Sequence, residues 1–144
     1  MEQNTDILLI EDNADDAGLT MRAFRKNQPA LRLAHFSDGA EALSYIFCEG
    51  AFRERDMNEL PRLILLDLKM PRIDGLEVLR RIKSDPRTCG VPVVMLSSSN
   101  EMTDIRRCYS HGANSYILKP VEFGDFLQTV AGLASYWLTL NQHA

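Results

Sequence analysis

Features that define several classes of protein are scarce or missing in this chain of 144 residues. Its three cysteines, Cys48, Cys89 and Cys108, lie far apart without CxxC spacing, so we predict neither a disulfide framework nor a zinc site. No apolar run approaches the roughly 18 residues that span a membrane. Acidic rather than basic residues precede the first short apolar run, unlike in a signal peptide. These absences predict a cytoplasmic protein that makes no use of the membrane.

An excess of basic charge is also missing. Lys and Arg number 16 against 20 Asp and Glu, and the formal net charge of −4 argues against nucleic acid as a partner. Hydrophobic residues (45%) and charged residues (25%) occur in the proportions of an ordinary globular protein. Because the chain shows no internal repeat, low-complexity tract or linker, we expect residues 1–144 to form a single domain.

Short apolar runs alternate with longer amphipathic stretches along the chain. Continuous apolar runs are typical of strands that are buried on both faces of a parallel sheet, and apolar residues at helical spacing indicate helices between them. The pattern predicts strands at residues 7–10, 31–36 (weaker and half exposed), 63–66, 91–96 and 116–118, and helices at residues 14–26, 39–47, 75–83, 104–109 and 122–141. This order predicts an α/β fold with right-handed crossovers and helices on both faces of the sheet.

Chemically active side chains gather where the predicted strands end. The ends of four strands carry Glu11 and Asp12, then Asp67, then Ser97 with Ser99, and Lys119. Each of these residues alone has an ordinary structural explanation, as a helix cap, a turn residue or a solvated surface charge. Because the carboxyl ends of parallel strands lie at one edge of the sheet, all of them would converge on one patch. That convergence favours a functional site.

Carboxylates clustered in such a patch repel and raise one another's pKa unless a cation lies between them. A few hard oxygen ligands suit Mg²⁺ better than a soft metal. A carboxylate beside Mg²⁺ can attack a phosphoryl group and form an acyl phosphate. A lysine ammonium and a serine hydroxyl then help to stabilise the charge on the phosphoryl oxygens. The patch therefore predicts phosphoryl transfer to an aspartate.

The segments that carry these residues resemble the three signatures of response-regulator receiver domains of two-component systems. They are residues 6–13 (DILLIEDN), 63–75 (LILLDLKMPRIDG) and 116–120 (YILKP). The resemblance implies a flavodoxin-like fold with strand order 2-1-3-4-5. It also implies that Asp67 is the phosphoacceptor of a sensor histidine kinase. Glu11 and Asp12 would hold Mg²⁺ (or Mn²⁺), together with Asp67 and the backbone carbonyl of Lys69.

The resemblance implies roles for the other residues of the patch. Ser97 matches the switch hydroxyl, Tyr116 the rotating aromatic switch, and Lys119 the phosphate-binding lysine, commonly followed by a cis proline. Phosphorylation would draw Ser97 and Lys119 inward and let Tyr116 turn, which changes the protein-binding surface. The domain would thus catalyse its own phosphorylation and dephosphorylation. We also predict that Lys69 and Ser99 flank the path of the attacking water and set the lifetime of the phosphorylated state.

Two further segments resemble the small stand-alone regulators that serve bacterial phytochrome-type histidine kinases. They are the long stretch at residues 48–61 and an extended C-terminal helix, predicted at residues 121–142. Because the receiver signatures and this helix fill the chain, we expect no output domain. Tyr136, Trp137 and Leu140 in the second half of the helix are expected to form a homodimer or kinase contact.

Other functions stay open at this point. An aspartate-nucleophile phosphatase of the haloacid dehalogenase type needs a second Asp two residues after the first, where this chain has Lys69. In a flavodoxin, Glu11 and Asp12 would repel the phosphate of the flavin. A scaffold that works without phosphorylation would not need every reacting position to be filled, whereas an intermediate in a phosphorelay would use the same residues. The three histidines, His35, His111 and His143, lack the spacing of metal ligands and are expected to have neither a metal nor a phosphorelay role.

Overall fold

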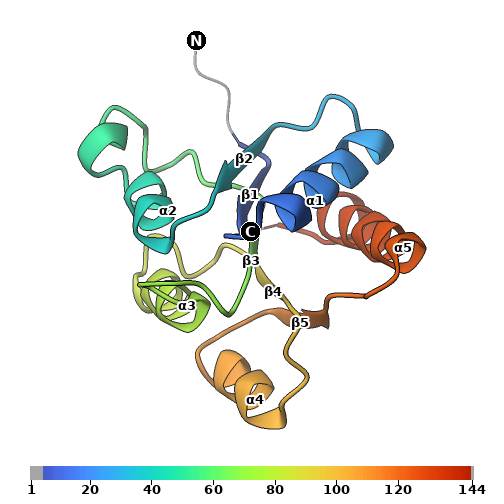
Figure 1. The fold of residues 1–144 in the computed structure, drawn as a ribbon. Helices are drawn as coiled ribbons and strands as arrows, with labels where there is room; N and C mark the ends of the chain where they lie inside the picture. The colour runs from blue at the N-terminus through green and yellow to red at the C-terminus, as the bar shows by residue number, and fades with distance from the viewer. Residues whose placement is uncertain (1–4, 144) are drawn as a thin grey trace.

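The apolar runs form one parallel sheet. The computed structural model describes residues 5–143, and its strands pair in the order β2-β1-β3-β4-β5 (Figure 1). They are β1 (Ile7–Ile10), β2 (Leu33–Phe36), β3 (Leu63–Leu66), β4 (Val93–Ser97) and β5 (Ser115–Leu118). The middle strands β1, β3 and β4 are buried throughout, whereas the edge strands β2 and β5 are partly exposed. Burial on both faces explains why the middle strands are almost wholly apolar while β2 alternates.

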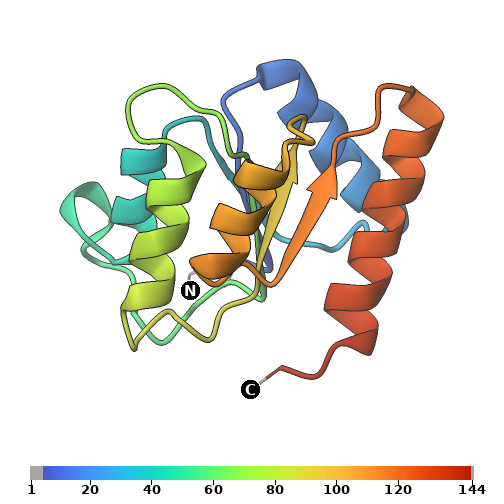
Figure 2. The ribbon, with the colours of Figure 1, turned by 90° about the horizontal axis from the view of Figure 1, so that it is seen from below.

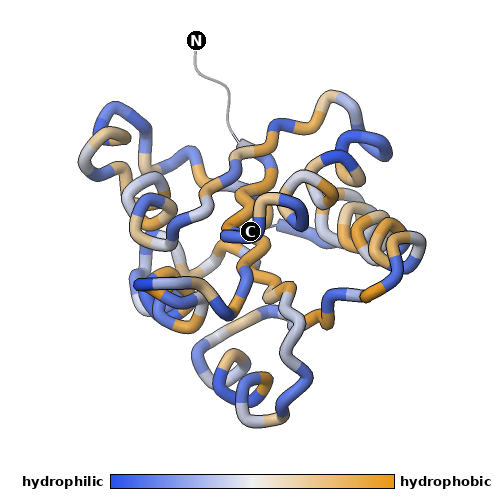
Figure 3. The backbone as a smooth tube through the Cα atoms, in the orientation of Figure 1, coloured by the Kyte–Doolittle hydropathy of each residue, from blue (hydrophilic) through white to orange (hydrophobic). Residues whose placement is uncertain are grey.

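Within residues 5–143, five α-helices cover both faces of the sheet (Figure 1). On one face lie α1 (Ala14–Asn27) and α5 (Phe123–Ala134), and on the other lie α2 (Gly39–Ile46), α3 (Gly75–Ser84) and α4 (Met102–Ser110). Successive residues of a strand point to opposite faces, so β1 contributes side chains to a separate hydrophobic core on each face of the sheet. Figure 3 shows the apolar strands in the middle of the molecule, with more polar helices around them. This is the predicted flavodoxin-like fold. None of the described helices combines the length and the hydropathy needed to cross a membrane.

The C-terminal helix differs from its predicted bounds of 121–142. It begins at Phe123, because Glu122 before it has extended backbone angles (φ −82°, ψ 137°). At Ser135 it passes into a π-helical segment, η2 (Ser135–Leu140), a rare form that nothing in the composition signals. Leu138 in η2 is buried, and its carbonyl accepts a hydrogen bond from Arg62 at 2.5 Å. The segment is therefore attached beside the start of β3, at the edge of the sheet where the helix ends in Figure 2.

The stretch at residues 48–61 packs beside the edge strand β2. It contains a short 3-10 helix, η1 (Gly50–Phe52). The rings of Phe36, Tyr45 and Phe52 contact one another, with centroids 5.0, 5.6 and 5.3 Å apart. The guanidinium of Arg55 lies over the Tyr45 ring, 3.7 Å from its centroid. Aromatic and cation–π contacts thus hold this long connection against the sheet.

Candidate functional site

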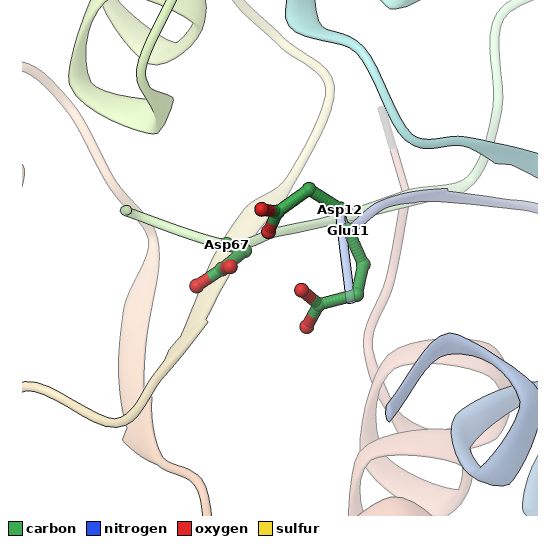
Figure 4. Close-up of side chains that lie close together, drawn as sticks. All are labelled: Glu11, Asp12 and Asp67. Atoms are coloured by element: carbon green, nitrogen blue, oxygen red, sulfur yellow. The ribbon is translucent and has the colours of Figure 1, made fainter. Parts of the chain in front are cut away.

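Three carboxylates meet beyond the C-terminal ends of β1 and β3 (Figure 4). Glu11 and Asp12 follow β1, Asp67 follows β3, and one oxygen from each lies within 4.8 Å of the others. The ladder between the strands continues past their ends, because the Asp67 N–H donates to the Ile10 carbonyl at 2.9 Å. Glu11 and Asp67 are buried, whereas Asp12 is exposed. The structure thus brings together the three carboxylates that the sequence pattern selected.

A glycine is required where α3 begins, next to Asp67. A Cβ atom on Gly75 would lie 2.1 Å from the Asp67 carbonyl oxygen and 2.8 Å from the Cα of Leu68, far inside contact distance. The Gly75 N–H donates to the Leu68 carbonyl at 2.8 Å. The Asp74 side chain caps the helix by accepting a hydrogen bond from the Glu77 N–H. The start of α3 therefore fixes the backbone that carries the Asp67 carboxylate.

Lys119, directly after β5, brings an ammonium group to the carboxylates. Its Nζ donates to Glu11 and to Oδ2 of Asp16, the latter at 3.1 Å, and lies 3.8 Å from Oδ1 of Asp67. Burial lowers the pKa of Lys119, but the hydrogen bond to Glu11 and the charges of Asp67 and Glu11 outweigh this effect and raise the pKa. Asp16 is absent from the sequence prediction, because acidic residues are common in the first turn of any helix.

Negative charge exceeds positive charge in this cluster. The carboxylates of Glu11, Asp16 and Asp67 surround the ammonium of Lys119, and the Asp12 carboxylate lies beside Glu11 and Asp67. Burial raises the pKa of Asp67 to about 8, with further contributions from the charge and hydrogen bond of Glu11, although the charge of Lys119 lowers it. Hard oxygen ligands with surplus negative charge fit a divalent cation such as Mg²⁺.

Ser97 and Tyr116 both contact Ser99, in the loop between β4 and α4. The Ser97 hydroxyl is fully buried and accepts a hydrogen bond from the Ser99 N–H at 3.1 Å. The Tyr116 hydroxyl donates to the Ser99 carbonyl at 2.8 Å. The two expected switch residues therefore contact the same loop residue, one at its N–H and the other at its carbonyl.

The peptide bond between Lys119 and Pro120 is trans, whereas the resemblance to receiver domains implies a cis bond. None of the described peptide bonds is cis, so the cis proline that the resemblance implies after Lys119 is wrong for this structure. The trans isomer is the intrinsically favoured state of an X–Pro bond.

Lys69 and Ser99 share a partner that sequence reasoning missed. Asp104, in the first turn of α4, accepts a hydrogen bond from the Ser99 hydroxyl at 2.6 Å and lies 3.5 Å from the Lys69 ammonium. The hydrogen bond from Ser99 and the charge of Lys69 lower the pKa of Asp104. No motif singles out Asp104, because its position beside Lys69 depends on how α4 packs.

His35 on β2 contacts the backbone of the site. Its Nε2 lies 2.8 Å from the Glu11 carbonyl oxygen. The Glu11 N–H donates to the Phe36 carbonyl at 3.0 Å. The backbone of Glu11 is therefore held from β2, while its carboxylate is held by Lys119.

Comparison with known protein families distinguishes a receiver domain from a haloacid dehalogenase phosphatase and from a flavodoxin. The response regulator receiver domain matches residues 7–131, which include every residue of the cluster. This chain belongs to the response regulator receiver family. Membership of that family sets aside the haloacid dehalogenase and flavodoxin alternatives.

Several relatives of this receiver domain are close over nearly the whole chain. It is 43% identical over 136 residues to the probable methanogenesis regulatory protein FilR2 of Methanothrix harundinacea, which covers 94% of this chain and 85% of that protein. The phosphorylated cyanobacterial phytochrome response regulator RcpA has a similar crystal structure, with TM-score 0.91, 36% identity, and coverage of 98% of this chain and 99% of that chain.

The Mn²⁺-bound crystal structure of response regulator Rcp1, a protein of Synechocystis, has TM-score 0.89 and 31% identity, and the similarity covers 99% of each chain. The predicted resemblance to regulators of phytochrome signalling is therefore confirmed.

Proposed function

We propose that this receiver domain accepts a phosphoryl group on Asp67 from a sensor histidine kinase, in a reaction that depends on Mg²⁺ or Mn²⁺. The observation that carries the proposal is a buried carboxylate at the end of β3, with two further carboxylates and the Lys119 ammonium beside it. RcpA is described as phosphorylated and Rcp1 as Mn²⁺-bound, which supports both parts of the proposal.

In the proposed transfer, an Asp67 oxygen forms a bond to phosphorus while the bond from phosphorus to the kinase histidine breaks, and the histidine nitrogen keeps the bonding electrons. The three carboxylates and the backbone carbonyl of Lys69 would hold the divalent cation, which supplies positive charge to the phosphoryl oxygens. Lys119 lies close enough to Asp67 for its ammonium to pair with another phosphoryl oxygen. Catalysis in this proposal is limited to the domain's own phosphorylation and dephosphorylation.

The contacts of Ser99 suggest how phosphorylation would reach the surface. A phosphoryl group adds roughly −1.5 to −2 charge, which attracts the Ser97 hydroxyl and the Lys119 ammonium. A moved Ser97 would no longer accept from Ser99 in the same geometry, and Tyr116 holds the carbonyl of that same residue. A charge change at Asp67 would thus alter the protein-binding surface formed by α4 and β5.

Lys69 and Ser99 are proposed to set the lifetime of the phosphorylated state. Each lies two residues beyond a residue of the site, at the start of the loop that follows β3 or β4. Replacing either by alanine is expected to change the rate at which label is lost after phosphorylation. Equal decay rates in the wild type and in both Lys69→Ala and Ser99→Ala would contradict this role.

A phytochrome-type histidine kinase is the proposed phosphoryl donor, because RcpA is described as a phytochrome response regulator. The free thiols of Cys48, Cys89 and Cys108 suit the reducing cytoplasm, where we place the protein.

We also propose a homodimer through η2, where the side chains of Tyr136 and Leu140 are 50% and 64% exposed. Light scattering with Mg²⁺ and a phosphoryl analogue tests the dimer, and a monomeric mass would oppose it.

Phosphorylation of Asp67 is tested with labelled acetyl phosphate and Mg²⁺. The wild type is expected to take up label, and Asp67→Asn and the wild type in EDTA are expected to take up none. Asp85→Asn, which removes a carboxylate paired with Arg87 after α3, serves as the matched control and should label normally. If Asp67→Asn took up as much label as the wild type, the proposal would be refuted.

A further inference from the structure

Asp104 joins the two loops of the site through a single carboxylate. Lys69 lies in the loop between β3 and α3, and Ser99 in the loop between β4 and α4. The Asp104 side chain is only 16% exposed, whereas that of Lys69 is 69% exposed. A partly buried carboxylate on α4 is therefore paired with an exposed ammonium from the β3–α3 loop.

The two partners of Asp104 depend on it to different degrees. Ser99 is also held by Ser97 and Tyr116, through its N–H and its carbonyl. Lys69, by contrast, forms no salt bridge with any described residue (5–143) other than Asp104. Loss of the Asp104 charge should therefore release Lys69 while Ser99 stays in place.

Space for Lys69 to move exists beside this ion pair. Residues of the β3–α3 loop, α3 and α4 enclose a cavity of about 80 Å³, lined by Leu68, Lys69, Asp74, Leu76, Asp104 and Arg107. Arg107 lies one turn after Asp104 on α4 and also helps to lower its pKa. The side chains of Lys69 and Asp104 therefore adjoin open space rather than close packing on every side.

We propose that Asp104 is a positioning residue, which holds the Lys69 ammonium away from the phosphorylated Asp67 and thereby shortens the life of that state. This inference rests on the proposed phosphorylation of Asp67. In hydrolysis, a water oxygen forms a bond to phosphorus, the bond from phosphorus to the Asp67 oxygen breaks, and inorganic phosphate leaves as a proton passes to solvent. An ammonium released from Asp104 pairs with the phosphoryl oxygens and obstructs the approach of that water.

The test compares the decay of label in the wild type, Asp104→Asn, Lys69→Ala and the double variant, after removal of acetyl phosphate. Asparagine keeps an oxygen that accepts from Ser99 but loses the charge that holds Lys69. We expect Asp104→Asn to slow decay about two- to five-fold, the range that a partly exposed ion pair can supply. In the Lys69→Ala background the same substitution is expected to have no further effect.

Two controls separate positioning from a general structural effect. Asp104→Glu keeps the charge and should restore decay toward the wild-type rate. Asp85→Asn removes an ion-paired carboxylate elsewhere and should leave the rate unchanged. Unchanged or faster decay in Asp104→Asn, or equal slowing with and without Lys69, would overturn the role of Asp104 while the labelling of Asp67 stands. Absence of label on the wild type, or label on Asp67→Asn, would instead overturn the proposed function and this inference together.

Discussion

The N-terminal edge of the sheet pairs its charged side chains, whereas the C-terminal edge gathers several carboxylates around one lysine. Before β1, Asp6 accepts from the Arg32 N–H at 3.0 Å and from its guanidinium at 3.3 Å. After α3, Asp85 accepts two hydrogen bonds from the Arg87 guanidinium, at 3.0 and 2.7 Å. At the opposite edge, burial and neighbouring carboxylates raise the pKa of Asp67 to about 8. The first edge is arranged for stability, whereas the second has the hard oxygen ligands and surplus negative charge that suit a divalent cation.

The largest expected difference between the edges concerns glycine. Gly75→Ala places a methyl group 2.1 Å from the Asp67 carbonyl oxygen, whereas a Cβ on Gly90, before β4, meets nothing within 4 Å. We expect Gly75→Ala to lower the free energy of unfolding by about 3 kcal/mol and to weaken Mg²⁺ binding. Gly90→Ala should change it by less than about 1 kcal/mol. Urea denaturation of both variants measures the difference, and equal losses would show that the approach of α3 to Asp67 is not restrictive.

The two edges should respond with opposite sign to loss of an aspartate charge. The pKa of Asp67 is raised from 3.8 to about 8 in the folded protein. Unfolding therefore releases a proton between these values, and stability falls as pH rises through them. In EDTA at pH 8, Asp67→Asn should raise the free energy of unfolding by more than about 1 kcal/mol.

Asp6→Asn, by contrast, should lower the free energy of unfolding by about 1–3 kcal/mol, because hydrogen bonds to a charged acceptor are lost. Chemical denaturation under the same conditions compares the two variants. If Asp67→Asn also lowered the free energy of unfolding, the repulsion among the carboxylates around Asp67 would already be balanced in the metal-free protein.

Binding of Mg²⁺ should depend on pH because the proton on Asp67 must leave. As the pH rises toward 8, the Kd for Mg²⁺ is expected to fall by up to about tenfold for each pH unit, and above pH 8 the Kd is expected to level off. Calorimetric titration of the wild type with MgCl₂ measures this slope. Asp67→Asn should bind more weakly without the slope, and Asp85→Asn should match the wild type. A slope that persists in Asp67→Asn would assign the proton to another group.

The smallest effect is expected for the exposed pair of Asp85 and Arg87. The hydrogen bonds from Arg87 lower the pKa of Asp85 to about 2. The pair therefore contributes fully above the ordinary value of 3.8, and its contribution is lost as pH falls through about 2. Between pH 3.8 and about 2, the melting temperature of Asp85→Asn should therefore fall slightly less than that of the wild type. The difference should be small because exposed ion pairs contribute little to stability. Thermal unfolding at both ends of the range checks it, and a steeper loss would contradict the lowered pKa.

Residues at strand ends could be predicted from the sequence, whereas their partners on helices could not. Glu11, Asp67 and Lys119 follow apolar runs, and parallel pairing alone brings such positions to one edge. Asp16 and Asp104 lie in the first turns of α1 and α4, where acidic residues are ordinary. Their contacts depend on where each helix packs against the sheet, which no local pattern encodes.

Element boundaries show the same limit. Strand β4 begins at Val93, two residues after its predicted start, because Pro92 has no N–H for the ladder and the Val93 N–H bonds to the Asn114 side chain instead. Strand β2 begins at Leu33, because Arg32 is engaged with Asp6. The π-helical turn at Ser135–Leu140 depends on contacts such as that of Arg62 with the Leu138 carbonyl. These bonds join parts of the chain that local periodicity treats separately.

The pairing of Lys119 with Glu11 spans 108 positions of the chain. Closing so long a loop costs conformational entropy that this one contact cannot repay, so the contact forms only with the sheet that supports it. During synthesis from the N-terminus, the carboxylates after β1 and β3 emerge well before their counter-charge. A nascent chain therefore carries the carboxylates before their lysine, and the proposed phosphorylation would require β5 to have completed this edge of the sheet.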